Sequence, residues 1–232
     1  MMKERLRGAI VRNLMWKKAP YYLMPYYEDK LICPASFAAW MVREPWEPES
    51  RKYLEEHVRE GDICIDVGAG VGHYTLLFSR LVGKNGVVYA FEPDPFMFQM
   101  LRANVRLNNL ENVILSRCTI GDHDGEMSFY VSTVGSSSLL PMQGLRSIIN
   151  VKVITIDSLN LSRLDWVKID TEGTEADVLR GMRATLKRCS PRLLVEFIPE
   201  NGPVDDLLNE LKGWNIQGLD HNILCEKEDE EA

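Results

Sequence analysis

A glycine-rich loop that follows an acidic residue carries the clearest chemical signal in this sequence. The apolar residues 63–65 lead into Asp66, and glycine then stands at positions 68, 70 and 72. Glycine allows backbone N–H groups to approach a ligand because no Cβ intervenes. The dinucleotide-binding pattern G-x-G-x-x-G would need its third glycine where His73 stands. An acid directed into the loop repels a pyrophosphate but suits a sulfonium or ammonium group, which favours S-adenosylmethionine (SAM) over NAD as the ligand.

A second acidic residue supports this interpretation. Glu92 ends the next predicted strand, 87–92, about 20 residues after the glycine loop, as expected for a carboxylate that holds ribose hydroxyls. Asp94 and Pro95 already form a good helix start, with Asp as the N-cap and Pro at the first position. Glu92 is therefore not needed as a cap, and we expect it to bind the ribose of the cofactor.

The elements that must position these residues alternate along the chain between short apolar strands and helices. This alternation predicts an α/β fold with a doubly wound, mostly parallel sheet. Such sheets bind ligands at the carboxyl ends of their strands, where Asp66, Glu92, Asp170 and Glu196 all stand. The expected strands are 63–67, 87–92, 112–117, 165–170 and 192–197, and the expected helices are 48–58, 73–82, 95–108, 174–188 and 203–212.

The regions before and inside this pattern carry less specific signals. Apolar residues recur every four positions between 6 and 14, which predicts a short helix that packs on the domain or forms a frayed arm, with an arm touching a membrane surface or nucleic acid as the alternative. The aromatic residues nearby either cover the active site or pack between subunits of a homo-oligomer. An insertion with strands at 126–132 and 150–156 holds a long connection, 133–149, which is functional or disordered. The expected regions are an N-terminal extension over 1–45, a main domain over 46–225 and an acidic tail over 226–232.

Composition limits the classes of function. With 232 residues, the chain is long enough for one α/β domain. Its net charge of −7 disfavours a mainly electrostatic interaction with nucleic acid. Five scattered cysteines without a C-x-x-C pair indicate reduced thiols in a cytoplasmic protein, and the four histidines lack the spacing of a metal site. No apolar run reaches the roughly 18 residues that span a bilayer, so we expect no transmembrane segment.

Several segments together resemble the FkbM-type methyltransferases over residues 46–200. They are Trp46-Glu47-Pro48, GDICIDVGAGVGHYT from position 61, FEPDP from 91, DWVKIDTEGTEADVLRG from 165 and PRLLVEF from 191. The glycine loop alone is common to many methyltransferases, whereas its combination with KID-x-EG-x-E at 168–175 is much more specific. The resemblance implies a Rossmann-like class I SAM-dependent fold and methylation of hydroxyl oxygens on sugars, lipids or polyketide-like products.

The resemblance also assigns residues to the cofactor. Many members of the family have Asn where Gly70 stands and Tyr where His73 stands, and these departures bear on the catalytic environment more than on cofactor binding. We expect the SAM site to consist of the glycine loop and the neighbouring strand ends. Its residues are Asp66, Gly68, Ala69, Gly70, Gly72, His73, Tyr74, Glu92, Pro93 and Asp170.

Methyl transfer to a hydroxyl requires an aligned acceptor and a group that takes its proton. General-base help of this kind is worth roughly 10²- to 10⁴-fold in rate. We expect Asp170, Glu172 and His73 to be the catalytic residues. Asp170 shares a strand face with Lys168, so a purely structural ion pair between them stays open as the alternative. The acceptor is expected to be a small molecule or a glycan.

Other acidic residues near this motif have plainer explanations. Glu175 stands at a predicted helix start, where Thr174 and Asp177 resemble a capping box and an acid often only complements the helix dipole. Asp170 and Glu196 offer the oxygen ligands that Mg²⁺ prefers. Acids at neighbouring strand ends are routine in this fold, however, and we expect no metal.

The main alternative function is methylation of RNA. The run from Asn104 to Asn108 looks like part of the second helix of some tRNA methyltransferases, and the first 18 residues are basic. The negative net charge argues against it, and KIDTEG stands where an N-P-P-Y-type amine-binding motif would be expected. A non-catalytic scaffold with the same fold would be expected to lack the acid at position 66 or 92, and both acids are intact.

Overall fold

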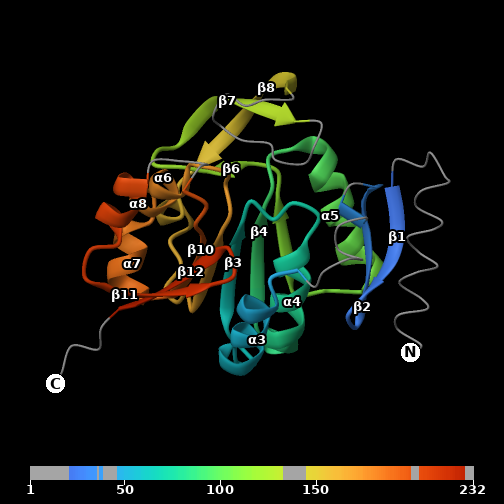
Figure 1. Ribbon diagram of the computed structural model, residues 1–232, viewed down its shortest axis with the longest axis horizontal. Coiled ribbons are helices and arrows are strands. Elements are labelled where there is room, and N and C mark those ends of the chain that lie inside the picture. Colours follow the sequence, from blue (N-terminus) through green and yellow to red (C-terminus); the bar gives the residue numbers. More distant parts are fainter. Residues whose placement is uncertain (1–20, 36, 39–45, 133–144, 200–203, 228–232) are drawn as a thin grey trace.

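A mostly parallel sheet lies between two layers of helices (Figure 1). The computed structural model describes residues 21–35, 37–38, 46–132, 145–199 and 204–227. Neighbouring strands follow the order β11-β12-β10-β9-β3-β4-β5, and β12 runs antiparallel to both of its neighbours. The strands are β3 (Ile63–Val67), β4 (Val87–Phe91), β5 (Val113–Ser116), β9 (Trp166–Ile169), β10 (Arg192–Glu196), β11 (Trp214–Leu219) and β12 (Asn222–Lys227).

This sheet confirms the predicted doubly wound α/β fold. The strands β3, β4, β5, β9 and β10 are parallel and lie where they were expected. Strands β3 and β9 are buried along nearly their whole length, as in other parallel sheets with helices on both faces. The hairpin β11–β12 was not anticipated. Its second strand continues to Lys227, and Arg192 Nε lies 2.6 Å from Glu226 Oε1, so the sheet includes the first two residues of the expected acidic tail.

Helices cover the two faces of the sheet in two groups of three. The first group packs Leu54, Phe78 and Leu101 on one face, and the second packs Val178 and Leu207 on the other. Within the described residues, no helix combines the length and the apolar character needed to cross a bilayer. The first group is α3 (Pro48–His57), α4 (His73–Val82) and α5 (Pro95–Leu107), and the second is α6 (Glu175–Arg180), α7 (Arg183–Cys189) and α8 (Val204–Glu210), with 3₁₀ turns η1 (Gly83–Asn85) and η2 (Asp157–Leu159).

The caps explain where these helices begin. Asp94 accepts hydrogen bonds from the N–H groups of Phe96 and Met97, which confirms the predicted start of α5. The single helix expected over 174–188 is instead two helices. The carboxylate of Asp157 accepts the N–H groups of Ala184 and Thr185, at 3.0 and 2.7 Å, so these amides begin α7.

A small second sheet replaces a helix between β5 and β9 and lies at the top of Figure 1. Its order is β6-β8-β7, with β7 and β8 antiparallel. Both strands expected in the insertion are present, although β8 begins earlier than predicted. The connection over 133–144 lies outside the described residues. The strands are β6 (Thr119–Ile120), β7 (Gly125–Ser132) and β8 (Leu145–Ile154).

A β-hairpin formed by β1 (Tyr21–Tyr26) and β2 (Asp29–Pro34) stands beside α5, at the right of Figure 1. Two asparagines one helical turn apart hold it there. Asn104 accepts the N–H of Ile32 and donates to its carbonyl, and Asn108 does the same with Lys30. These side chains act on β2 as a neighbouring strand would. The helix predicted for residues 6–14 lies outside the described residues.

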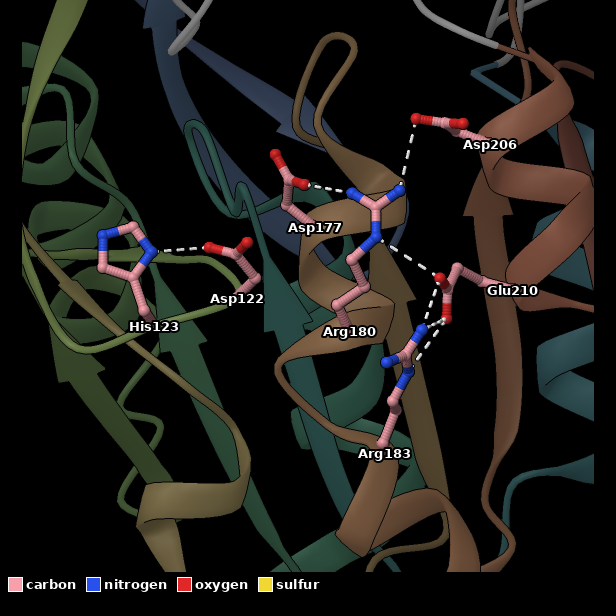
Figure 2. Close-up of polar contacts among 7 residues, drawn as sticks. All are labelled: Asp122, His123, Asp177, Arg180, Arg183, Asp206 and Glu210. Atoms are coloured by element: carbon pink, nitrogen blue, oxygen red, sulfur yellow. Dashed lines mark hydrogen bonds and ion pairs between the residues drawn. The ribbon is translucent and has the colours of Figure 1, made fainter.

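Ion pairs connect the helices on the second face of the sheet (Figure 2). Glu210 of α8 accepts from Arg180 of α6 and from Arg183 of α7, with the shortest contact at 2.7 Å. Arg180 also bonds Asp177 and Asp206. One carboxylate therefore joins the three helices that support the end of β9.

Candidate active site

The carboxyl ends of four parallel strands meet around one cavity. Asp66, Glu92, Asp170 and Glu196 stand at the ends of β3, β4, β9 and β10, and all four line it, as the sequence predicts. Aromatic residues from the chain before the domain and from the small sheet close the other sides. The lining residues are Phe37, Trp46, Asp66, Gly68, Ala69, Gly70, Val71, His73, Tyr74, Glu92, Pro93, Met97, Thr119, Phe129, Asp170, Thr171, Glu172, Thr174 and Glu196.

Gly68 and Gly70, in the loop between β3 and α4, differ in what a side chain at each position would contact. A Cβ on Gly68, whose φ is +77°, would lie 1.7 Å from the carbonyl oxygen of Asp170. Gly68 is therefore required by packing within the protein. A Cβ on Gly70, whose φ is +54°, would meet nothing within 4 Å, and this residue lines the cavity. Gly70 thus leaves open space where a ligand can contact the loop backbone.

Asp66 is buried at the end of β3 with 1% of its surface exposed. Its carboxylate accepts a hydrogen bond from Thr75 Oγ1 at 2.5 Å, and its cross-strand partner on β9 is Lys168. Burial raises the pKa of Asp66 to about 6, while Thr75 and Lys168 act in the opposite direction. The acid is thus held in place by the first turn of α4, and a positively charged ligand would favour its ionised form.

Glu92 turns toward the glycine loop. Its two carboxylate oxygens accept the N–H groups of Gly70 at 2.7 Å and of Asp94 at 2.8 Å. Burial raises the pKa of Glu92 to about 8, although both amides favour the charged form. The side chain therefore lies between the loop and the start of α5, with a fixed orientation toward the cavity.

His73, the first residue of α4, is buried and packed by aromatic rings. Its Nδ1 is hydrogen-bonded to the hydroxyl of Tyr26 on the hairpin, and its ring centroid lies 5.2 Å from that of Trp46. Burial, and secondarily the charge of Lys168, lowers the pKa of His73 to about 3. The imidazole is therefore neutral and a weak proton acceptor.

Tyr74 follows His73 and faces the same cavity. Its hydroxyl donates to Glu47, and it accepts from Asn222 Nδ2 at 3.4 Å. The ring centroid lies 5.1 Å from the ammonium nitrogen of Lys168. The hydroxyl is thus engaged in the protein, and the ring is the part of Tyr74 that lines the site.

Lys168 is fully buried in the middle of the sheet. Its Nζ donates to Asp170 Oδ2 at 3.2 Å, which confirms the ion pair considered from the sequence. Burial acts to lower the pKa of this ammonium, but the carboxylates of Asp170, Glu47 and Glu196 outweigh that effect and the pKa is raised. Lys168 therefore supplies a fixed positive charge beneath the acidic floor of the cavity.

The turn after β9 is shaped by Glu175 and not by the expected capping box. Thr174 makes no capping bond with its side chain. Instead, Glu175 Oε1 accepts the N–H groups of Thr171 and Gly173 and the Thr171 hydroxyl, each at 3.0 Å. This holds Glu172 in the left-handed region with φ of 57°. Glu175 is thus a positioning residue for the turn that carries Glu172.

Three carboxylates form a cluster at the end of β9 and β10. One oxygen from each of Asp170, Glu172 and Glu196 lies within 4.8 Å of the others. Burial, followed by the charge of Asp170, raises the pKa of Glu196 to about 9, and Lys168 opposes this shift. The cluster forms the acidic side of the cavity opposite Glu92.

Most of the predicted SAM residues are brought together here, and Gly72 is the exception. Gly72 is the N-cap of α4 and does not line the cavity, and a Cβ there would meet Leu101 Cδ1 at 2.7 Å. The open space above Gly70 and the buried acids at positions 66 and 92 fit a cationic nucleoside ligand. Sequence analysis did not identify Phe129 or Thr119, which come from the small sheet, or Phe37. Phe37 stacks on Trp46 at 5.6 Å, and only the general aromatic content of the extension pointed to this pair.

Comparison with known proteins agrees with this geometry. A family model described as the methyltransferase FkbM domain matches residues 66–215. "Methyltransferase 1" of Beauveria bassiana is 30% identical over 149 residues, which cover 53% of this chain and 59% of that protein. Hexuronic acid methyltransferase AglP of Haloferax volcanii is 29% identical over 191 residues, 77% of each chain. The 31-O-demethyl-FK506 methyltransferase FkbM of Streptomyces tacrolimicus is 36% identical over 111 residues, 46% of this chain and 41% of that protein.

Solved structures share the fold at low identity. Methyltransferase FkbM from Methylobacillus flagellatus superposes with a TM-score of 0.54 and 17% identity, covering 83% of this chain and 53% of that one. An rRNA methylase from Streptococcus thermophilus gives a TM-score of 0.50 at 14% identity, covering 78% and 95%. Such identities show the class I methyltransferase fold alone. The family match is separate from them and covers the glycine loop, β9 and β10, so this chain belongs to the FkbM methyltransferase family, with S-adenosylmethionine as its methyl donor.

Proposed function

We propose that this enzyme transfers a methyl group from SAM to a hydroxyl oxygen of a sugar or of another small-molecule or glycan acceptor. The donor is held by Asp66 and the glycine loop on one side and by Glu92 on the other. The acceptor enters next to the carboxylate cluster of Asp170, Glu172 and Glu196. When bound, the donor supplies an activated methyl group, and the protein aligns the acceptor and excludes water.

The character of the cavity wall is the observation that supports a hydroxyl acceptor. Among the described residues, no Lys or Arg lines the cavity, whereas five carboxylates do. Carboxylates accept hydrogen bonds from hydroxyl groups and repel acidic groups. The rings of Phe37, Trp46 and Phe129 offer apolar surface beside them. A neutral molecule with several hydroxyl groups and an apolar face suits this combination.

The names of the relatives point in the same direction. One relative is named for a hexuronic acid and another for 31-O-demethyl-FK506, and the second name specifies an oxygen that lacks its methyl group. A hexuronic acid offers both a carboxylate and hydroxyl groups. Because the cluster beside β9 and β10 is acidic, we propose that the hydroxyl is the oxygen methylated by this chain.

Within this proposal the predicted catalytic residues have distinct roles. Asp170 is fixed by Lys168 and accepts a hydrogen bond from the acceptor hydroxyl. Glu172 reaches the acceptor from the turn above. The imidazole of His73, packed between Tyr26 and Trp46, shapes the wall and orients the acceptor.

Transfer of radiolabelled methyl groups to a panel of acceptors tests the proposal. The panel contains neutral glycosides, the matching uronic acids and unmodified tRNA, each with tritiated SAM. We expect labelling of a neutral glycoside in a form that survives mild base, because methyl ethers resist hydrolysis. A base-labile label on the uronic acid would show esterification of a carboxylate, and label confined to tRNA would show an RNA methyltransferase.

A further inference from the structure

The three clustered acids beside the acceptor are not equivalent. Lys168 Nζ donates to Asp170 Oδ2 at 3.2 Å and is itself fully buried. The strand register places Glu196 beside Asp170, because Leu194 pairs with Lys168 and Val195 with Ile169. Among the described residues, the carboxylate of Glu196 makes no hydrogen bond or ion pair. One acid of the cluster therefore has a permanent cationic partner, and its neighbour does not.

The charges around Glu196 determine where a proton resides. Asp170 at the end of β9, Glu172 on the turn and Glu175 on α6 act on Glu196 with negative charge, and Lys168 opposes them. Like charges at such separations cannot all be ionised without cost, so one carboxyl group retains a proton. Lys168 favours the charged form of Asp170. The proton of the cluster consequently belongs on Glu196.

We propose that Glu196 is the catalytic residue that takes the proton of the acceptor hydroxyl, while the Lys168–Asp170 pair positions that hydroxyl. The inference rests on the proposed function. The acceptor O–H bond breaks and its proton goes to Glu196. The oxygen uses the freed electron pair to bond the methyl carbon, and the pair that joined this carbon to sulfur stays on the neutral thioether product. Glu196 then returns the proton to solvent.

This role requires Glu196 to be ionised before the acceptor reacts. A cationic ligand in the cavity that Glu196 lines stabilises the carboxylate form. Binding of SAM should therefore release the proton from Glu196. S-adenosylhomocysteine has nearly the same shape but a neutral sulfur, so it should release less. The two ligands form a matched pair that isolates the effect of one charge.

Isothermal titration calorimetry measures this release without any acceptor. SAM and S-adenosylhomocysteine are titrated at about pH 7.5 in two buffers of different ionisation enthalpy, which gives the protons released per ligand bound. We expect wild type to release a larger fraction of a proton with SAM. Glu196→Gln should bind both ligands and lose the difference, whereas the exposed control Glu111→Gln should keep it.

The outcomes separate the inference from the proposed function. If wild type binds neither ligand, the proposed function fails. If it binds both with equal proton release, or if Glu196→Gln keeps the difference, only the role of Glu196 fails. Equal release in wild type overturns that role even where the variant does not fold, whereas a larger release with SAM is assigned to Glu196 only by its loss in Glu196→Gln, because Asp66 and Glu92 also have raised pKa values. Tight binding of Mg²⁺ by wild type that is lost in Glu196→Gln would also overturn the proposal, because the cluster would then hold a metal ion in place of the proton.

Turnover gives a second test once an acceptor is known. Glu196→Gln should lower kcat by roughly 10²- to 10⁴-fold with little change in KM, as expected for loss of a general base. A purely structural role would affect both constants, or neither, and would leave the pH dependence of kcat unchanged.

Discussion

Gly68 and Asp170 lie in such close contact that a Cβ on Gly68 would be 1.7 Å from the carbonyl oxygen of Asp170. The glycine loop, which we propose binds the donor, and the strand end, which we propose faces the acceptor, are thus parts of one packed unit. Gly68→Ala should destabilise the fold by at least about 3 kcal/mol, because steric overlap adds to the left-handed backbone cost. Urea denaturation measures this loss.

Gly213→Ala is the matched control for that substitution. Gly213 also has positive φ, at +80°, but a Cβ there would meet nothing within 4 Å. Gly213→Ala should lower the free energy of unfolding by only about 1–2 kcal/mol, which is the cost of placing a Cβ on a left-handed backbone. Equal losses for the two variants would show that the contact between Gly68 and Asp170 relaxes easily.

Donor binding should depend on both buried acids. At 100 times its Kd, SAM is expected to raise the free energy of unfolding of wild type by about 2.7 kcal/mol, with a matching rise in melting temperature. Asp66→Ala and Glu92→Ala should each abolish that rise, and exposed Asp122→Ala should keep it. Neither NAD nor ATP should stabilise wild type. The site assignment is wrong if both acid variants bind SAM as tightly as wild type.

Lys168 should matter through its charge. Lys168→Met leaves Asp170 and the acids around it without their buried cation, and such losses cost about 3–5 kcal/mol. The loss should be smaller at acidic pH, where the carboxylates are protonated. Denaturation at several pH values measures it, with exposed Lys187→Met as the control. A loss independent of pH would mean that Lys168 acts mainly by packing its methylene chain.

Asn104 should anchor the hairpin to the donor site. Besides its two bonds to Ile32, it donates to the carbonyl of Val71 in the glycine loop at 2.8 Å. Asn104→Ala leaves the buried carbonyl of Val71 and the part-buried N–H and carbonyl of Ile32 unpaired and should cost about 3 kcal/mol. Asn108→Ala breaks the equivalent exposed bonds to Lys30 and should cost about 1 kcal/mol or less. Proteolysis within the hairpin should accelerate only in the first variant.

Stability should also report the protonation of Glu92. Its folded-state pKa of about 8 lies above the ordinary value of 4.5, so the folded protein binds the proton more tightly than the unfolded chain. The associated stabilisation is complete below the ordinary pKa and is lost as pH rises toward 8. Without SAM, Glu92→Gln should therefore gain stability relative to wild type between about pH 5 and pH 8. A constant difference across that range would show that Glu92 is already ionised.

Sequence reasoning identified the main sheet because buried parallel strands are short apolar runs that end in acids. The residues 63–67 and 166–169 have this pattern, and their position fixes Asp66 and Asp170 at one edge. The donor half of the site follows from this local pattern. Because parallel strands end on the same side of a sheet, the acids at their ends could be expected to line one cavity.

The missed features depend on contacts between distant residues. Nothing periodic in residues 21–34 announces a hairpin, and Pro25 weakens the strand pattern of β1. The side chains that hold it, Asn104 and Asn108, come from a helix far along the chain and had suggested a tRNA methyltransferase instead. Likewise, Asp157 divides the helix expected over 174–188, and no local signal marks that cap.

The stacked pair of Phe37 and Trp46 lies before residue 66, where the match to the family begins. The donor loop and the acids at the strand ends lie within the matched region. We therefore expect exchange of a short stretch of chain ahead of the matched region to alter which acceptors fit beside the proposed donor site, while the matched region itself stays intact. Chimeras that graft this leading stretch between relatives offer a direct way to redirect the enzyme to new acceptors.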